Sequence, residues 1–139
     1  MNWLYYLLQF TWGLPMNIIG ALAFLILHCI LGYPIARFRN MYYIQILPRF
    51  GGVNLGMFCV IGKDCESVLP HEYGHSIQNL WWGALMPFFI GIPSMIRYWY
   101  RELVVLSGEL LTSGYDDIWF EGQATALGNR ATLNDWSWL

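Results

Sequence analysis

The feature that most constrains the fold of this chain is a long N-terminal stretch without charge. No charged residue occurs in residues 1–36, and residues 14–31 consist mainly of Ile, Leu, Ala and Phe. At about 1.5 Å per residue, this run forms a helix of roughly 27 Å, close to the thickness of the hydrocarbon core of a bilayer. We therefore expect residues 1–36 to be a membrane anchor, in which Gly13 and Pro15 separate an interfacial segment from an N-terminal transmembrane helix.

The residues around the apolar run support this interpretation. Trp3, Tyr5, Tyr6 and Trp12 precede it and Tyr33 follows it, as in the aromatic belts at membrane interfaces. Two arginines come directly after it and predict that this end faces the cytoplasm. A basic n-region is absent, so a retained anchor is expected rather than a cleaved signal peptide. The alternative is a buried core helix of a soluble protein, which rarely exceeds about 14 uniformly apolar residues.

Composition narrows the class of protein further. Only 12% of the 139 residues are charged, against about 25% in average soluble proteins, whereas 57% are hydrophobic, which excludes intrinsic disorder. A net charge of -2 gives no basic surface for nucleic acid. The three cysteines imply no disulfide framework. We expect Cys29 to act as a small apolar side chain, and whether Cys59 and Cys65 pair stays open.

Residues 37–139 are expected to form one zinc-binding domain, so that the whole chain is an α+β protein, mainly helical. Residues 41–47 and 53–61 are rich in β-branched and aromatic residues, and turn residues occupy 48–52 between them. This pattern predicts a short β-hairpin.

Two helices are expected in the same domain. Ser67 can cap a helix that carries Pro70 in its first turn and runs to about Trp82. Asp116 can cap a last helix that runs to about Leu127.

The first of these helices carries an H-E-x-x-H motif, His71-Glu72-Tyr73-Gly74-His75. Residues four apart lie on the same helix face, so both imidazoles can bind one Zn²⁺ ion. Glu72 lies beside them and can accept a proton from a water that the metal activates. Gly74 costs up to about 1 kcal/mol relative to Ala inside a helix, which predicts that another segment approaches the backbone there.

A catalytic zinc takes three protein ligands and a water, so one ligand must come from elsewhere. We expect it to be Glu121, which shares a helix face with Thr125; Thr125 would hydrogen-bond one of the ligands. The small Ala124 permits close approach to the motif helix. An alternative stays open, in which Glu121 is a solvated helix carboxylate. The third ligand would then be His28, Glu102 or Glu109.

Residues 80–96 form a second uncharged run, broken by Pro87 and Pro93. If this run crossed the membrane, His75 and Glu121 would lie on opposite sides of it. We therefore expect residues 80–96 to be buried or re-entrant at the membrane surface, with the following arginines near lipid phosphates or substrate.

The combination of H-E-x-x-H with Glu121-Gly122-Gln123-Ala124, an E-x-x-A element, resembles gluzincin-type zinc metallopeptidases. It is especially similar to membrane-bound CAAX-prenyl and stress-response endopeptidases, in which an Asp stands at the position of Thr125. The segments HEYGHSIQNL, IPSMIRYWY and WFEGQATALG also resemble a group of small uncharacterised bacterial membrane proteins. The resemblance implies His71, His75 and Glu121 as zinc ligands, Glu72 as the catalytic base, and an integral protein of a bacterial inner membrane.

Together these observations predict a membrane-anchored zinc hydrolase, a peptidase acting on a peptide or membrane-protein substrate. Arg97, Tyr98 and Tyr115 are candidates for contacting the oxyanion or the substrate. Two alternatives belong to other classes. The first is a catalytically inactive, zinc-stabilised membrane interaction protein, and the second is a lipid-binding or pore-forming module that uses only the apolar runs.

Overall fold

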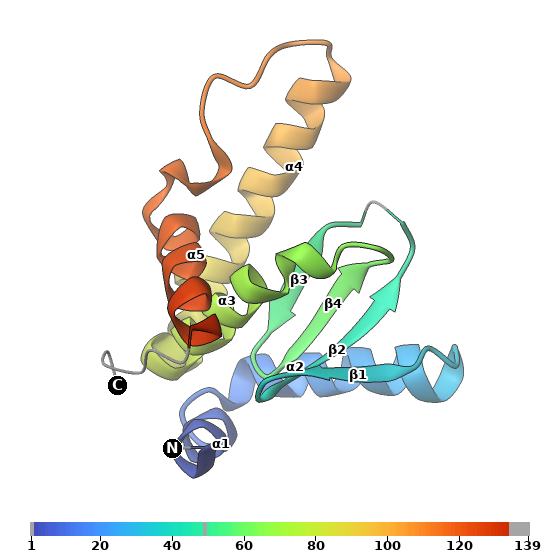
Figure 1. Cartoon of the computed structure of the whole chain (residues 1–139), viewed down its shortest axis with the longest axis vertical. Helices are drawn as coiled ribbons and strands as arrows, with labels where there is room; N and C mark the ends of the chain where they lie inside the picture. Colours follow the sequence, from blue (N-terminus) through green and yellow to red (C-terminus); the bar gives the residue numbers. More distant parts are fainter. Residues whose placement is uncertain (1, 49, 134–139) are drawn as a thin grey trace.

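A computed structural model describes residues 2–48 and 50–133, which form a mixed α+β fold (Figure 1). The N-terminal half contains α1 (Asn2–Phe10), α2 (Leu14–Phe24), the π-helix η1 (Leu25–Ile30), β1 (Ile35–Phe38), β2 (Met41–Ile46), β3 (Gly52–Leu55) and β4 (Phe58–Gly62). The C-terminal half contains η2 (Glu66–Val68), α3 (Leu69–Trp82), η3 (Gly83–Leu85), η4 (Pro87–Gly91), α4 (Ile92–Leu106), η5 (Tyr115–Asp117) and α5 (Trp119–Thr132).

The four strands form one sheet in the order β1-β2-β4-β3. β2 pairs with β4 in parallel, and the other two pairs are antiparallel. The predicted hairpin between residues 41–47 and 53–61 is therefore wrong. Residues 53–61 contain two strands, because Gly56 turns the chain at a positive φ of 78° and its N–H donates to the Asn54 side chain. β1, which pairs with β2, was not expected.

The two predicted helices of the zinc-binding domain are present, but their caps differ from the prediction. α3 begins at Leu69, and neither Ser67 nor any other side chain caps it, because Ser67 lies in the preceding 3-10 turn. α5 begins at Trp119 after an extended Ile118 and has no side-chain cap. Asp116 lies in a separate 3-10 turn, so both predicted caps are wrong.

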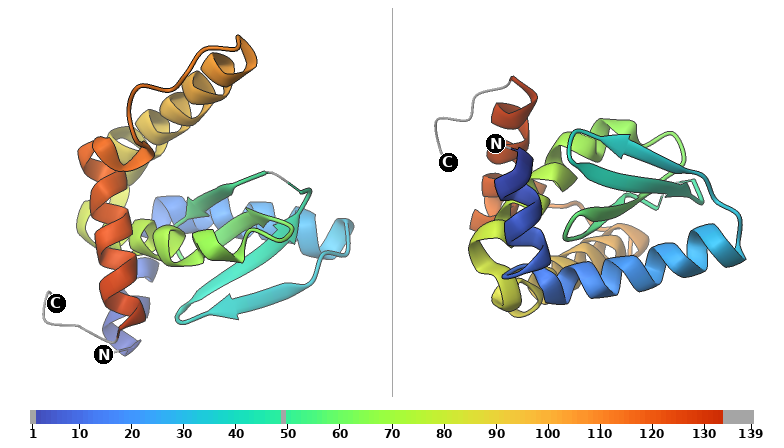
Figure 2. Two further views of the ribbon diagram at one scale, coloured as in Figure 1. Left: turned by 45° about the horizontal axis from the view of Figure 1, so that its top comes forward. Right: turned by 90° about the horizontal axis from the view of Figure 1, so that it is seen from below.

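α3 packs between the sheet and α5, and its apolar residues Tyr73 and Ile77 are fully buried (Figures 1 and 2). The close approach predicted at Gly74 is confirmed. The carbonyl of Ala124 lies where a Cβ of residue 74 would stand, and the carbonyl of Pro70 stands in the same way against Gly128. Glycine at these two positions therefore lets α3 and α5 cross with their backbones in contact.

The residues predicted as an anchor pack against the rest of the protein on one side. Phe24 of α2 packs against Phe58 of β4, and the buried Asn17 accepts a hydrogen bond from the N–H of Met57. In the described part of the chain, no single helix has the length and hydropathy needed to cross a bilayer. Two helix pairs, bent by 90° and 118°, meet these criteria when each pair is taken together. The transmembrane helix thus stays a prediction.

Residues 80–96 reverse the direction of the chain. The bend of 118° separates the helix that ends at Leu85 from the one that begins at Pro87. Met86 and Ile90 are buried at this bend, whereas Phe88 and Phe89 are exposed. The reversal returns α4 along the side of the molecule that carries the H-E-x-x-H motif.

Candidate metal centre

The structure brings His71, His75 and Glu121 together, as the sequence predicted. One oxygen of Glu121, Oε2, lies 3.0 Å from Nε2 of His71 and 3.1 Å from Nε2 of His75. Each residue offers one ligand atom, and these atoms all lie within 4.8 Å of one another. Ligand atoms around a tetrahedral Zn²⁺ with bonds of about 2.0–2.1 Å lie about 3.3 Å apart. The three side chains are therefore close enough to bind one metal ion.

The outer nitrogens of both imidazoles have partners. Nδ1 of His71 lies 2.7 Å from the hydroxyl of Thr125, which confirms the predicted contact of Thr125 with a ligand. Nδ1 of His75 lies 2.7 Å from the amide oxygen of Gln78, which can only accept a hydrogen bond. When His75 is neutral, its proton therefore lies on Nδ1 and its Nε2 is free to bind a metal ion; when His75 is protonated, its Nε2–H donates to Glu121. Either a proton or a metal ion can therefore occupy the space between Nε2 of His75 and the carboxylate.

Glu121 is ionised in this environment. Burial alone would raise the pKa of its fully buried carboxyl, but the hydrogen bonds with His71, His75 and Ser94 outweigh burial and hold the pKa well below its ordinary value. Ser94 of α4 donates its hydroxyl to Oε1, the oxygen that does not face the imidazoles. One carboxylate oxygen is thus held by α4, and the other stays directed at the two histidines.

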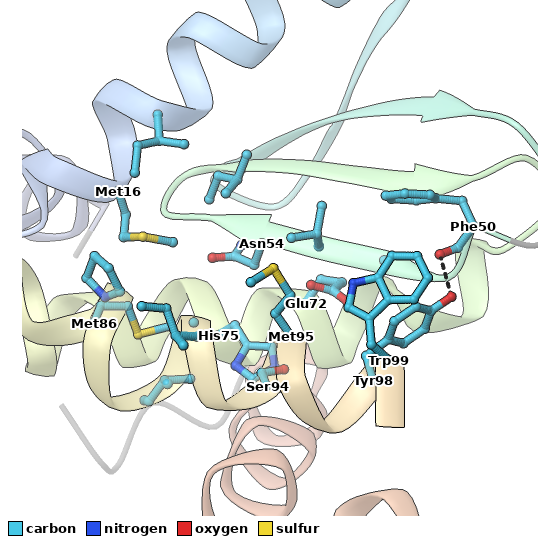
Figure 3. Close-up of a pocket in the computed structure, with 18 of the residues that line it drawn as sticks. Met16, Phe50, Asn54, Glu72, His75, Met86, Ser94, Met95, Tyr98 and Trp99 are labelled. Carbon is cyan, nitrogen blue, oxygen red and sulfur yellow. Dashed lines mark hydrogen bonds between the residues drawn. The ribbon is translucent and has the colours of Figure 1, made fainter. Parts of the chain in front are cut away.

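Glu72 lies next to this cluster in a cavity of about 410 Å³ that is bounded by α2, β3, α3 and α4 (Figure 3). Its Oε2 atom is buried and has no hydrogen-bond partner among the described residues. Burial raises the pKa of Glu72, and the negative charge of Glu121 adds to this effect, while His75 and His71 oppose it. A carboxylate with a raised pKa and a free oxygen suits a general base.

Glu72 is also held against the sheet. Its carboxylate fills the space that a side chain at Gly52 of β3 would need. Glycine at position 52 therefore allows the edge strand to lie directly against this acid. His75, Ser94 and Tyr115 line the same cavity, so the cavity reaches one candidate ligand, His75, and the serine that donates to another, Glu121.

Of the three residues predicted to contact the oxyanion or the substrate, two line the cavity and one does not. Tyr98 and Tyr115 line the cavity. Burial raises the pKa of Tyr115 to about 12, so its hydroxyl keeps its proton and can donate it in a hydrogen bond. Arg97 is outside the lining, because its guanidinium donates to the carbonyls of Tyr115 and Gly114. It fastens α4 to the segment before α5.

The alternative ligands lie outside the cluster. Nδ1 of His28 is 2.8 Å from the carbonyl oxygen of Tyr33, and Glu102 and Glu109 are exposed. Among the described residues, the only group of three or more such side chains that could hold an ion is His71, His75 and Glu121. Cys29, Cys59 and Cys65 are free thiols, so Cys59 and Cys65 do not pair.

Two residues of the site were missed from the sequence. Gln78 follows His75 by three residues, and this helical spacing was the available signal. Besides accepting from His75, Gln78 donates its amide to the carbonyl of Phe120 and to the side chain of Gln123 on α5. Ser94 gave no signal, because its place depends on the bend between α3 and α4.

Comparison of the chain with protein-family models, with curated proteins and with solved structures gives no match. The arguments for function therefore come from the residues and their geometry.

Proposed function

We propose that this protein is a zinc-dependent hydrolase, and specifically a peptidase. One observation carries the proposal: two imidazole nitrogens and one ionised carboxylate oxygen converge beside a buried glutamate that has a free oxygen and faces a cavity. Nitrogen and carboxylate ligands in this number suit zinc with one position left for water. The resemblance of the H-E-x-x-H and E-x-x-A elements to gluzincin-type metallopeptidases supports the same function.

The residues divide the chemistry among them. His71, His75 and Glu121 would hold the zinc ion, which supplies a Lewis acid that polarises the scissile carbonyl and acidifies water. Glu72 takes a proton from the water as its oxygen attacks the carbonyl carbon. Glu72 then gives this proton to the amide nitrogen as the C–N bond breaks, so that one acid and one amine form. Tyr115 donates a hydrogen bond to the developing oxyanion.

Replacement of the base tests this mechanism. Glu72→Gln should keep one zinc per chain and lower the rate of hydrolysis by about 10²–10⁴-fold, because the proton acceptor is lost while the ligands stay. His75→Ala should lose both zinc and activity. The measurements are zinc content by atomic absorption and cleavage of an unbiased peptide library by mass spectrometry. Glu109→Gln, which changes an exposed carboxylate outside the site, is the matched control and should behave like the unchanged protein.

The other outcomes point to the alternative functions. Bound zinc without hydrolysis of any peptide would favour the inactive, zinc-stabilised interaction protein. A protein that binds no zinc would leave only a module that uses its apolar surface. The position of the site on the cytoplasmic side of a bacterial inner membrane stays a prediction from the sequence.

A further inference from the structure

α4 turns its polar side toward the molecule and its apolar side outward. Arg97 and Arg101 donate to backbone carbonyls of residues 113–115, and Ser94 donates to Glu121. The opposite side presents a stripe with helical spacing, which we call the outer stripe. Its members are all exposed: Ile92, Met95, Ile96, Trp99, Tyr100 and Leu103.

The outer stripe belongs to a wider apolar face. Ile19 and Leu22 of α2 are exposed, as are Phe88 and Phe89 at the bend before α4. α2 and α4 run along the same side of the molecule, whereas the sheet and α5 lie on the other side (Figure 2, right). We define the apolar face as the outer stripe together with these four residues. Large exposed apolar surfaces of this kind mark protein or membrane contacts.

The cavity of the metal centre opens on this face. Ile19, Met95 and Trp99 line the cavity, yet 48%, 56% and 60% of their surfaces are exposed. They therefore form its rim, with α2 on one side and α4 on the other (Figure 3). A molecule that reaches Glu72 by this route passes between apolar side chains.

Apart from Glu72 and His75, which the proposed chemistry uses, the cavity offers no charged partner for a substrate group. Among the described residues that line it, there is no lysine, arginine or aspartate, and Glu72 is the one carboxylate. The nearest cations on α4 are already used, since Arg97 and Arg101 bind backbone carbonyls. A charged side chain or chain terminus would therefore be desolvated here without an ionic partner outside the proposed catalytic residues.

We propose that a lipid bilayer covers the apolar face and that the substrate is an uncharged, apolar polypeptide segment that enters the cavity from the bilayer. The claim about the substrate rests on the proposed peptidase function. A bilayer fits better than a second copy of the chain, because a copy seated on the face would cover the rim and close the cavity. The bilayer instead brings apolar segments to the rim while it covers the exposed side chains.

Binding to vesicles tests the surface without reference to activity. Ile96→Glu and Leu103→Glu place a charge on the outer stripe at positions that do not line the cavity. The full-length protein should float with vesicles of phosphatidylcholine and phosphatidylglycerol, and both variants should bind at least about tenfold less. Leu133→Glu, an exposed position after α5, is the matched control and should bind normally. Equal binding by all variants, or dimerisation in gel filtration that only the stripe variants lose, would overturn the proposal.

Hydrolysis tests the substrate class. The probes are a Leu/Ala peptide of about 20 residues in vesicles, the same peptide with a central lysine, and a short soluble peptide with the same apolar centre. Ile96→Glu should slow cleavage of the embedded peptide about tenfold, and should leave cleavage of the soluble peptide unchanged. Equal cleavage of the lysine peptide would overturn the substrate class. If the zinc-loaded protein cleaves none of the probes, the proposed peptidase function is wrong. The vesicle assay still tests separately whether the apolar face binds a bilayer.

Discussion

α5 and α4 both contribute to the candidate metal centre, but the two helices are held to the rest of the protein in different ways. α5 lies with its backbone against that of α3, because Gly74 and Gly128 leave no side chain between them. None of the residues of α4 (Ile92–Leu106) is buried. α4 is fastened instead by polar side chains, such as Ser94 on Glu121 and Arg97 on Gly114 and Tyr115.

This difference separates two tasks. The helix pair α3 and α5 fixes His71, His75 and Glu121 relative to one another, and a metal site needs such fixed geometry. α4 bounds the cavity, and the hydrogen bonds that fasten it can break and re-form at a smaller cost than a packed crossing. The experiments below test whether the two helices differ in this way.

The largest effect is expected at the crossing of α3 and α5. Gly74→Ala places a methyl group against the carbonyl of Ala124, a backbone atom that cannot move aside. We expect a loss of about 3 kcal/mol or more in the free energy of unfolding, or failure to fold. Urea unfolding followed by circular dichroism measures it.

Gly91 provides the control at the start of α4. The nearest atom to an added Cβ there is the carbonyl oxygen of Met86, at an ordinary contact distance of 3.7 Å. Gly91→Ala should therefore leave stability unchanged or raise it by up to about 1 kcal/mol. If both variants lost equal stability, the proposed difference between the two helices would be refuted.

A smaller effect is expected on metal affinity when the partners of the ligands are removed. Thr125→Val and Gln78→Leu delete the groups that contact Nδ1 of His71 and His75, and each should weaken zinc binding by about 10–100-fold. Ser94→Ala removes only the contact from α4 to the outer oxygen of Glu121, so we expect a weaker loss, below about tenfold.

Competition with a fluorescent zinc chelator gives the three affinities under identical conditions. An affinity loss for Ser94→Ala that equals or exceeds those of Thr125→Val and Gln78→Leu would mean that α4 fixes the centre as firmly as α5 does. The division of tasks between the two helices would then be wrong.

The parts of the site that follow from helix geometry were predictable from the sequence. The spacing of His71 and His75 puts both on one face, and the cost of Gly74 inside a helix indicates that another segment contacts the backbone there. Thr125, one turn after Glu121, was predicted in the same way. These inferences need only the period of a helix and the preferred ligands of zinc.

The parts that depend on distant pairing were not predictable. β2 pairs with β4 and not with β3, the next strand in the sequence. Nothing in the local pattern of residues 53–61 selects that partner. Gly56, with its positive φ, marks the turn between β3 and β4. The contribution of Ser94 follows from the 118° bend before α4. Met86 and Ile90 are buried at this bend, and the sequence does not reveal that packing.

The smallest effect is expected in the pH dependence of stability, because protons and zinc compete for the same side chains between α3 and α5. Burial lowers the pKa of His75, but the hydrogen bond with Glu121 and the negative charges of Glu72 and Glu121 together outweigh it, so the pKa is raised in the folded protein. This group stabilises the metal-free protein below its unfolded pKa of about 6.5, and the contribution is lost as pH rises through the raised value. Glu121, with its lowered pKa, stabilises above about pH 4.3 and loses its contribution as pH falls through its folded pKa.

The metal-free protein should therefore be most stable in the mildly acidic window between these limits, and its melting temperature should fall by a few degrees toward pH 8. Zinc needs unprotonated imidazoles, so the stabilisation by zinc should grow over the same interval. Thermal unfolding in EDTA and in excess zinc, from about pH 5.5 to 8, measures both curves. A gap between them that does not widen with pH would show that His75 is not exchanging a proton for the metal.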